Sequence, residues 1–124
     1  MVVKPIIVTV PVHIKSLNET LSTHWRTRAP TNVTHRYSAF MALKAATKWE
    51  YGVFPCTVTL TRVAPRELDD DNLIGGFKSV RDGVADWLGL ADNDPRVKWR
   101  YAQQRAPKAR LYSALIEIVP DGAA

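Results

Sequence analysis

The sequence predicts a single α/β domain of the α+β class over residues 1–124, in which a mixed β-sheet is packed by two main helices in the order β-α-β-α-β-β. Three observations favour this fold. The 124 residues are enough for one hydrophobic core and too few for two comfortable ones. Four segments have the composition or alternation of strands, and two segments between them have helical character. With 46% hydrophobic and 23% charged residues, the chain has the composition of a globular protein rather than of a disordered one.

The first half of the chain is predicted to contain a strand, a long loop and a helix. Residues 4–12 alternate in the manner of a half-buried strand. Residues 13–32 are rich in Ser, Thr, Asn and Arg, which is typical of a loop, and a loop of this length inside a compact domain is more often functional than idle. Residues 33–50 contain neither Gly nor Pro and are predicted to be helical.

A β-branched strand and an amphipathic helix follow. The strand runs from Cys56 to Val63, and Pro65 stops it. Over residues 71–88, apolar side chains recur at spacings of 4, 3, 4 and 3 and so form one helical stripe: Leu73, Phe77, Val80, Val84 and Trp87. Gly89 supplies the C-terminal cap of this helix, with Leu90 placed for the hydrophobic contact that accompanies such caps.

Two further strands, at about 97–104 and 110–119, complete the predicted sheet and are joined by a turn around Pro107. In the first of them, the apolar side chains share one face of the sheet, and Lys98 and Arg100 share the other.

The composition also bears on the compartment. No apolar run approaches the roughly 20 residues that a membrane-spanning helix needs, so no membrane association is expected. The apolar N-terminus contains Pro5 and Pro11 and lacks a small-residue cleavage site, which favours a first strand over a signal peptide. The single cysteine, Cys56, cannot form an internal disulfide and is expected to be buried. These features favour a cytoplasmic protein.

The net charge of +5 is unevenly distributed along the chain. Cations dominate residues 15–48 and 96–110, whereas most of the acids lie from Glu67 to Asp94. Basic stretches of this kind are compatible with binding to DNA phosphates. The cations expected to contact DNA are Lys15, Arg26, Arg28, Arg36, Lys98 and Arg100. Trp25 lies among them and is expected either to stack on unpaired bases or to anchor the loop on the core.

Two acidic clusters flank the predicted second helix. The first, DDDNL at residues 69–73, lies where a strand has ended and the helix begins, and the second, DNDP at residues 92–95, lies in the loop after the helix. The helix and its return loop are expected to fold the second cluster back towards the first. Converging aspartates suit Mg²⁺, which prefers carboxylate oxygens and activates water for phosphodiester hydrolysis. Gly75 and Gly76 would leave room for a sugar-phosphate backbone, and Lys78 would hold a phosphate.

Simpler explanations of the same residues stay open. Aspartates are common helix N-caps and favour the positive end of the helix dipole, which would account for the run from Asp69 to Asp71. Asp82 could pair with Lys78 four residues earlier, and residues 92–95 could be a turn. The sequence excludes other site chemistries, because it has no Cys/His zinc pattern, no EF-hand spacing and no serine nucleophile motif.

The order of these motifs is itself informative. The run Asp69-Asp70-Asp71-Asn72-Leu73 stands at the strand-to-helix junction, a lysine follows in the helix, and Asp94-Pro95-Arg96-Val97 precedes the next strand. This arrangement resembles the RusA-type Holliday junction resolvases, which carry Asp-x-Asp-Asn-Leu at such a junction and a further aspartate before a strand. The similarity covers roughly residues 65–118, and the acidic segment also resembles phage- and prophage-borne members of the family.

The resemblance implies a magnesium-dependent endonuclease, with manganese as the alternative ion, that resolves four-way (Holliday) DNA junctions in recombination and repair. It implies a homodimer that nicks two strands of the junction. By the same resemblance, Asp69, Asp71 and Asp94 are the metal-binding catalytic carboxylates, with Asp92 as an auxiliary ligand.

This chain departs from the family at the catalytic lysine. The family lysine commonly lies four residues after the second Asp of the motif, where this sequence has Gly75. Lys78 lies on the same helical stripe and is expected to substitute for it, unless Lys98 or Arg100 makes the phosphate contact instead.

Two other functions stay open beside the junction-resolving endonuclease. One is a branched-DNA-binding protein without catalysis, in which the acids serve as caps. The other is a metal-dependent nuclease that acts on flaps or replication forks.

Overall fold

A computed structural model describes residues 5–16, 18–19, 25–47, 55–106 and 112–121 of the chain. Its helices and strands are, in order, β1 (Ile6–Val10), α2 (Trp25–Ala46), β2 (Cys56–Ala64), α3 (Asp70–Gly76), α4 (Lys78–Leu88), β3 (Val97–Arg105) and β4 (Ser113–Pro120). The predicted α+β class, with one mixed sheet in a single small domain, is confirmed.

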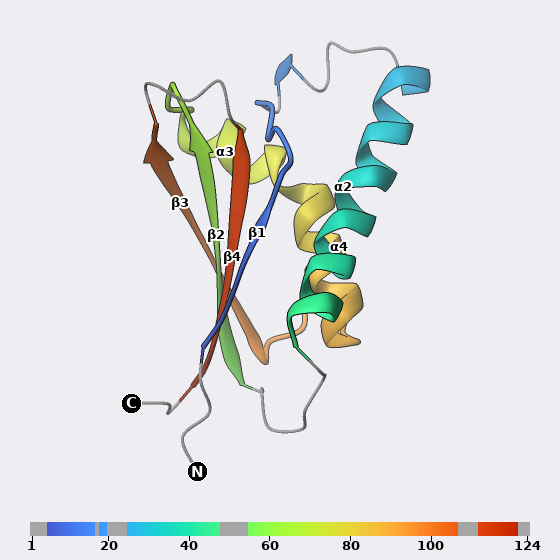
Figure 1. Ribbon diagram of the computed structural model, residues 1–124, viewed down its shortest axis with the longest axis vertical. Coiled ribbons are helices and arrows are strands. Elements are labelled where there is room, and N and C mark those ends of the chain that lie inside the picture. The colour runs from blue at the N-terminus through green and yellow to red at the C-terminus, as the bar shows by residue number, and fades with distance from the viewer. Residues whose placement is uncertain (1–4, 17, 20–24, 48–54, 107–111, 122–124) are drawn as a thin grey trace.

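The strands form one mixed sheet in the order β1-β4-β2-β3. β2 and β3 are parallel, whereas β4 is antiparallel to both β1 and β2. The last two strands of the chain therefore do not pair with each other, because β2 lies between them. The turn predicted around Pro107 falls outside the described residues. Since β1, β2 and β3 run in one direction, they end at one edge of the sheet, which we call the carboxyl edge (upper end in Figure 1).

Helices α2 and α4 lie side by side over one face of this sheet (Figure 1). The apolar stripe predicted for the second helix faces the sheet and is buried, with Phe77, Val80 and Val84 each 0% exposed. Cys56 is buried in β2, as predicted, and burial raises the pKa of its thiol to about 11.

The two helices approach each other closely at Gly83. A Cβ added at this position would overlap the carbonyl oxygen of Arg36 and would meet the Cβ of Ala39 at 3.0 Å. Ala39 is itself fully buried. The crossing of α2 and α4 therefore has no room for a side chain at Gly83.

The predicted end of the second helix is confirmed at Gly89, which has φ 73° and ψ 26°. Its N–H donates to the Asp86 carbonyl, and the Leu90 N–H donates to the Ala85 carbonyl, both at 3.1 Å. This pair of bonds is a Schellman cap, and its left-handed residue favours glycine because a Cβ is strained at this φ.

The prediction of a loop over residues 13–32 is wrong for residues 25–32, because α2 begins at Trp25. The polar composition and Pro30 indicated a loop, since proline lacks the N–H that a helix interior needs. The helix nevertheless passes through Pro30, and the hydroxyl of Thr34 donates to the Pro30 carbonyl at 2.9 Å. At its other end α2 stops at Ala46, and residues 48–50 lie outside the described residues. Within the described ranges, no helix combines the length and apolar character that a bilayer crossing requires.

The second predicted helix is divided into α3 and α4 at Phe77, so residues 70–88 form two helices rather than the single one predicted. Glycine is unfavourable inside a helix, and Gly75 and Gly76 come just before the division. Gly76 also packs on the loop after β1, because a Cβ there would overlap the Lys15 carbonyl oxygen and would meet Ile14 Cγ2 at 3.1 Å. The space expected here for a sugar-phosphate backbone is, at Gly76, occupied by the chain's own loop.

Candidate functional site

The carboxyl edge brings together segments that are far apart in the sequence. Near the end of β3, the side chain of Gln103 accepts from the Leu68 N–H at 2.8 Å and donates to the Leu68 carbonyl at 2.7 Å. Helix α3 begins two residues after Leu68. The loop after β1 reaches the same place, since the Asn18 N–H donates to Asn72 Oδ1 at 2.9 Å. In α/β proteins, ligands commonly bind where parallel strands end.

Asp69 is the N-cap of α3. Its Oδ1 accepts from the backbone N–H and from the side-chain amide of Asn72, both at 2.9 Å. The capping role that the sequence left open is therefore present for Asp69, and it accounts for an aspartate at this position without any metal.

Asp70 and Asp71 occupy the first turn of α3 and are exposed. Within the described part of the chain, neither carboxylate takes part in a hydrogen bond or an ion pair. Of the two Asp residues in the Asp-x-Asp-Asn run, Asp71 therefore has no structural contact that explains it.

Asp94 lies at the opposite edge of the sheet. Arg96 binds it with its backbone N–H at 2.9 Å, with Nε at 3.1 Å and with Nη2 at 3.0 Å. The hydrogen bonds from the Arg96 side chain are the main reason that the pKa of Asp94 is lowered. The Arg96 carbonyl in turn accepts from the Cys56 N–H at the first residue of β2.

The prediction that Asp94 converges with Asp69 and Asp71 is wrong for the side chains of one chain. Leu68, just before Asp69, is hydrogen-bonded to Gln103 near the end of β3, whereas the Asp94 carbonyl accepts from the N–H of Val97 at the start of the same strand. The six residue steps of β3 from Val97 to Gln103 span roughly 20 Å. The cause is the parallel pairing of β2 and β3, because the helices that connect parallel strands leave at the carboxyl edge and return at the other edge. Among the described residues, no three His, Cys, Asp or Glu side chains lie together as a metal-binding group.

Asp92 and Lys78 belong to an ion cluster beside β3. Lys78 Nζ contacts Asp82 Oδ1 at 3.0 Å, which is the expected i,i+4 pair, and Asp92 Oδ2 at 3.2 Å. The pKa of Lys78 is raised mainly by its bond to Asp82, and the pKa of Asp92 is lowered mainly by its bond to Lys78. Lys78 is thus paired with two carboxylates, Asp82 and Asp92, and neither of them belongs to the α3 acids.

Arg81 holds the same return loop against the sheet. Its guanidinium carbon lies 4.5 Å from the ring centroid of Trp99, and Nη1 donates to the Tyr101 hydroxyl at 2.9 Å. Arg81 Nη2 and Trp99 Nε1 both donate to the Asp92 carbonyl, at 2.7 and 2.9 Å. The loop that carries the second acidic cluster is therefore fixed to β3 by side chains of α4 and the strand.

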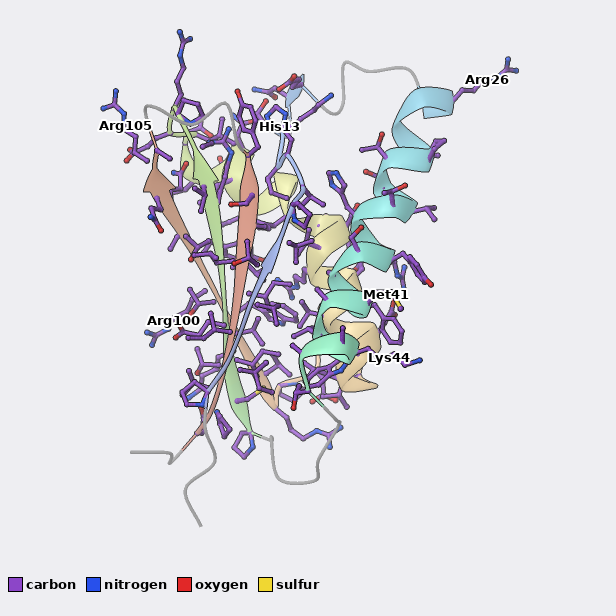
Figure 2. All side chains as sticks on the ribbon, in the orientation of Figure 1. His13, Arg26, Met41, Lys44, Arg100 and Arg105 are labelled. Carbon is purple, nitrogen blue, oxygen red and sulfur yellow. The ribbon has the colours of Figure 1, made fainter. Side chains whose placement is uncertain are left out.

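The cations expected to contact DNA lie on separate surfaces. Lys15 is exposed at the carboxyl edge, and Arg26 is exposed at the start of α2 (Figure 2). Lys98 and Arg100 are exposed on the face of the sheet opposite the helices, where Lys98 Nζ lies 3.6 Å from Asp121 Oδ2. The side chain of Arg28 is outside the described residues.

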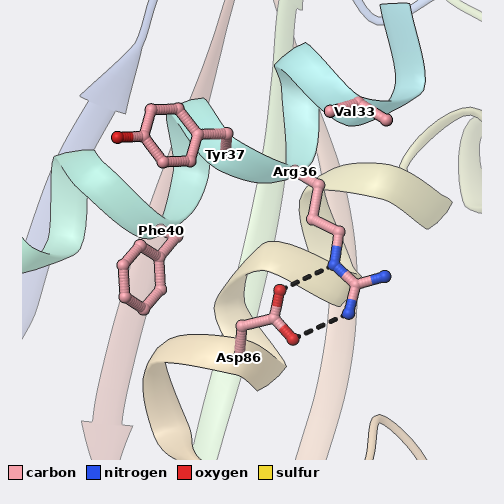
Figure 3. Close-up of a pocket in the computed structure, with 5 residues that line it drawn as sticks. All are labelled: Val33, Arg36, Tyr37, Phe40 and Asp86. Atoms are coloured by element: carbon pink, nitrogen blue, oxygen red, sulfur yellow. Dashed lines mark hydrogen bonds and ion pairs between the residues drawn. The ribbon is translucent and has the colours of Figure 1, made fainter. Parts of the chain in front are cut away.

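Arg36 is committed to an ion pair. Its Nε and Nη2 donate to the two carboxylate oxygens of Asp86 at 2.6 and 2.8 Å (Figure 3). The pair borders an open, mostly apolar groove of about 400 Å³, which is also lined by Val33, Tyr37 and Phe40. No acid of the α3 cluster lines this groove, so it is distinct from the carboxyl edge.

One residue that organises the carboxyl edge was missed in the sequence. Arg62 is only 6% exposed, and its guanidinium donates to the carbonyls of Ile14, at 2.9 Å, and of Arg66. It therefore ties the loop after β1 to the loop before α3. The available indication was its position, because Arg62 occupies an inward-facing place in the alternation of β2. Burial is the main reason that its pKa is lowered.

The carboxyl edge thus combines the acids Asp69 and Asp71 with exposed cations, and hydrogen bonds hold its loops in place. Two carboxylates are a sufficient protein contribution for Mg²⁺, which usually completes its shell with waters and substrate phosphates.

The chain matches no known protein-family model, and a search of curated proteins finds none that is significantly similar to it.

Proposed function

We propose that this protein is a magnesium-dependent endonuclease that cleaves branched DNA, with the four-way junction as its substrate and with Mn²⁺ able to replace Mg²⁺. The observation that carries the proposal is the place of the Asp-x-Asp-Asn-Leu run, which begins α3 at the carboxyl edge and leaves Asp71 exposed, with no hydrogen bond or ion pair to another described residue.

The acids at this edge are of the ligand type that magnesium prefers. Asp71 and Asp69, whose Oδ1 carries the cap, would hold the ion, and DNA phosphates and water would complete its shell. When bound, the ion would neutralise a non-bridging phosphate oxygen and lower the pKa of the attacking water. Lys15 is exposed nearby, beside Gly76, and would attract the sugar-phosphate backbone.

A homodimer is part of the proposal. A four-way junction presents two equivalent strands related by a two-fold axis, and two copies of one chain related in the same way can each cut one of them. We also place the protein in the cytoplasm, on the support of a single buried cysteine with no disulfide partner.

A second candidate is a branched-DNA-binding protein without catalysis. Two observations favour it: Asp69 has a capping role, and Asp94 is held by Arg96 at the far edge. In this candidate the acids stabilise helix and turn, and the cations alone bind DNA.

The deciding experiment compares end-labelled four-way junction, flap, fork and matched duplex, each with Mg²⁺, with Mn²⁺ and with a chelator. We expect cutting of the junction with either ion and none with the chelator. Preferential cutting of flaps or forks would assign the nuclease to those substrates instead.

The matched variants are Asp71→Asn and Asp70→Asn. Both remove one exposed negative charge from the same helical turn, but only Asp71 belongs to the Asp-x-Asp pair. We expect Asp71→Asn to bind the junction and to cut it slower by orders of magnitude, and Asp70→Asn to cut at close to the parental rate. Junction binding by all forms with cutting by none would establish the second candidate.

A further inference from the structure

The carboxyl edge carries a pair of stacked aromatic rings that the proposed function does not use. The rings of His13 and Tyr112 have centroids 3.7 Å apart and planes inclined by 25°. Tyr112 is 37% exposed, and His13 is partly buried. The stack therefore presents the Tyr112 side chain to solvent with the His13 ring packed against it.

The pairing of β1 with β4 places these rings at the carboxyl edge. The last pair of that ladder towards the edge is Val10 with Ala114. His13 follows Val10 by three residues and Tyr112 precedes Ala114 by two, so both lie just beyond the paired strands. Figure 2 shows His13 at the same end of the molecule as Arg105, the last residue of β3.

The surroundings of the stack are basic. Burial is the main reason that the pKa of His13 is lowered; Glu19 acts in the opposite direction, and Arg62 and Lys15 lower the pKa further. The lowered pKa favours the neutral imidazole, which contributes an aromatic surface rather than a charge. Lys15, Arg66 and Arg105 are exposed around the same edge.

We propose that Tyr112, supported by His13, is a stacking platform for an unpaired nucleobase of a DNA strand whose phosphates contact the exposed cations of the carboxyl edge. Proteins that bind single strands combine these two features, aromatic faces for the bases and a basic track for the backbone. Stacking of this kind tolerates any base, because every base has a π-face. The inference rests on the nucleic-acid-binding part of the proposed function and is independent of its cleavage step.

The proposal adds a contact at the branch point. Unpaired bases are available where strands separate, and placing such a base on Tyr112 costs no base pair. Because the loop of His13 continues to Lys15 beside Gly76 and to Asn18 bound to Asn72, the platform and the α3 acids are parts of one connected edge.

The test measures binding of a fluorescent single-stranded oligonucleotide of about 12 nucleotides, within the range of known single-strand sites, and of a matched duplex. The full-length chain is assayed in the presence of a chelator of divalent cations, so that no cleavage occurs. Tyr112→Leu is expected to weaken binding of the single strand by about five- to a hundredfold, the range for loss of one base stack, and to leave duplex binding unchanged.

Two matched variants separate stacking from fold. Tyr112→Phe keeps the ring and should bind as the parent does. Tyr37→Leu removes a tyrosine that is 62% exposed on α2, away from the edge, and should also bind as the parent does. Parental single-strand binding by Tyr112→Leu, or equal losses for strand and duplex, would overturn the platform.

A measurement on the unaltered protein guards against a folding defect in the variant. Photo-cross-linking of an oligonucleotide that contains iodouracil should label the peptide with Tyr112, and labelling confined to other peptides would contradict the proposal. Thymidine monophosphate should compete only weakly with the strand. Competition equal to that of the strand would assign the site to free nucleotides and overturn the strand interpretation.

The two proposals can fail separately. A parent protein that binds the single strand through Tyr112 and never cuts a junction in Mg²⁺ would refute the nuclease and support the platform. A parent that cuts, with unimpaired single-strand binding by Tyr112→Leu, would refute the platform alone.

Discussion

The Oδ1 atom of Asp69 accepts two hydrogen bonds from Asn72, one from the backbone N–H and one from the side-chain amide, both at 2.9 Å. Asn72 passes this connection on, since its Oδ1 accepts from the Asn18 N–H. The first and last polar residues of the Asp-x-Asp-Asn run therefore start the helix and fasten a distant loop to it. Asp71, between them, is exposed, and its carboxylate makes no hydrogen bond or ion pair with the part of the chain that the structure describes.

Asp69→Ala is expected to lower the free energy of unfolding by about 1 kcal/mol, because alanine cannot accept the bond from the Asn72 N–H. Asp69→Asn should keep most of the stability, since asparagine is an equally good N-cap. Urea denaturation followed by circular dichroism measures both. Asp71→Ala is the control, and a loss as large as that of Asp69→Ala would contradict the assignment of the cap to Asp69.

The double variant Arg26→Ala with Arg28→Ala is expected to weaken junction binding and to reduce its salt dependence. Each phosphate contact contributes about 0.9 to the slope of log K against log salt, so the slope should fall by up to about two units. Lys44→Ala, at the other end of α2, is the control. An unchanged slope between about 50 and 200 mM salt would show that the start of α2 does not follow the phosphate backbone.

Gly83→Ala is expected to destabilise the protein by about 1–3 kcal/mol, because the new methyl group would overlap the Arg36 carbonyl and force α2 away from α4. Thermal denaturation measures the loss. Ser79→Ala, on the same helix, is the control for the effect that alanine has on helix propensity. A Gly83→Ala protein as stable as the parent would mean that α2 does not pack on α4 at this crossing.

Stability is expected to fall as the pH drops below the ordinary histidine pKa of 6.5. Burial is the main cause of the lowered pKa of both His13 and His35, so the unfolded chain binds protons that the folded protein excludes. Above this pH both states are neutral at these residues, and stability does not depend on them. Denaturation curves between about pH 8 and pH 5 should show a shallower fall for the His13→Gln, His35→Gln double variant than for the parent.

Local patterns were sufficient for most elements of the fold. The strand alternation of β2, the apolar stripe from Leu73 to Trp87 and the cap at Gly89 depend on residues within one or two turns of each other, and all are present in the structure. The start of α2 was missed because Pro30 and a polar composition are locally unfavourable to a helix. The division at Phe77 was missed because it also involves the contact of Gly76 with the loop at Lys15.

Three features could be predicted from the sequence: the α+β class, the approximate order of strands and helices, and the position of Asp69 to Asp71 at a strand-to-helix junction. Each of them follows from the preferences of neighbouring residues. Two others follow from the three-dimensional arrangement alone: Asp94 lies at the far edge of the sheet, and His13 and Tyr112 meet at the near one. Both outcomes depend on which strands pair and in which direction. Because β2 and β3 are parallel, Asp94 lies at the end of the sheet opposite α3. Because β4 pairs with β1, Tyr112 contacts the ring of His13, although the two residues are 99 positions apart in the chain.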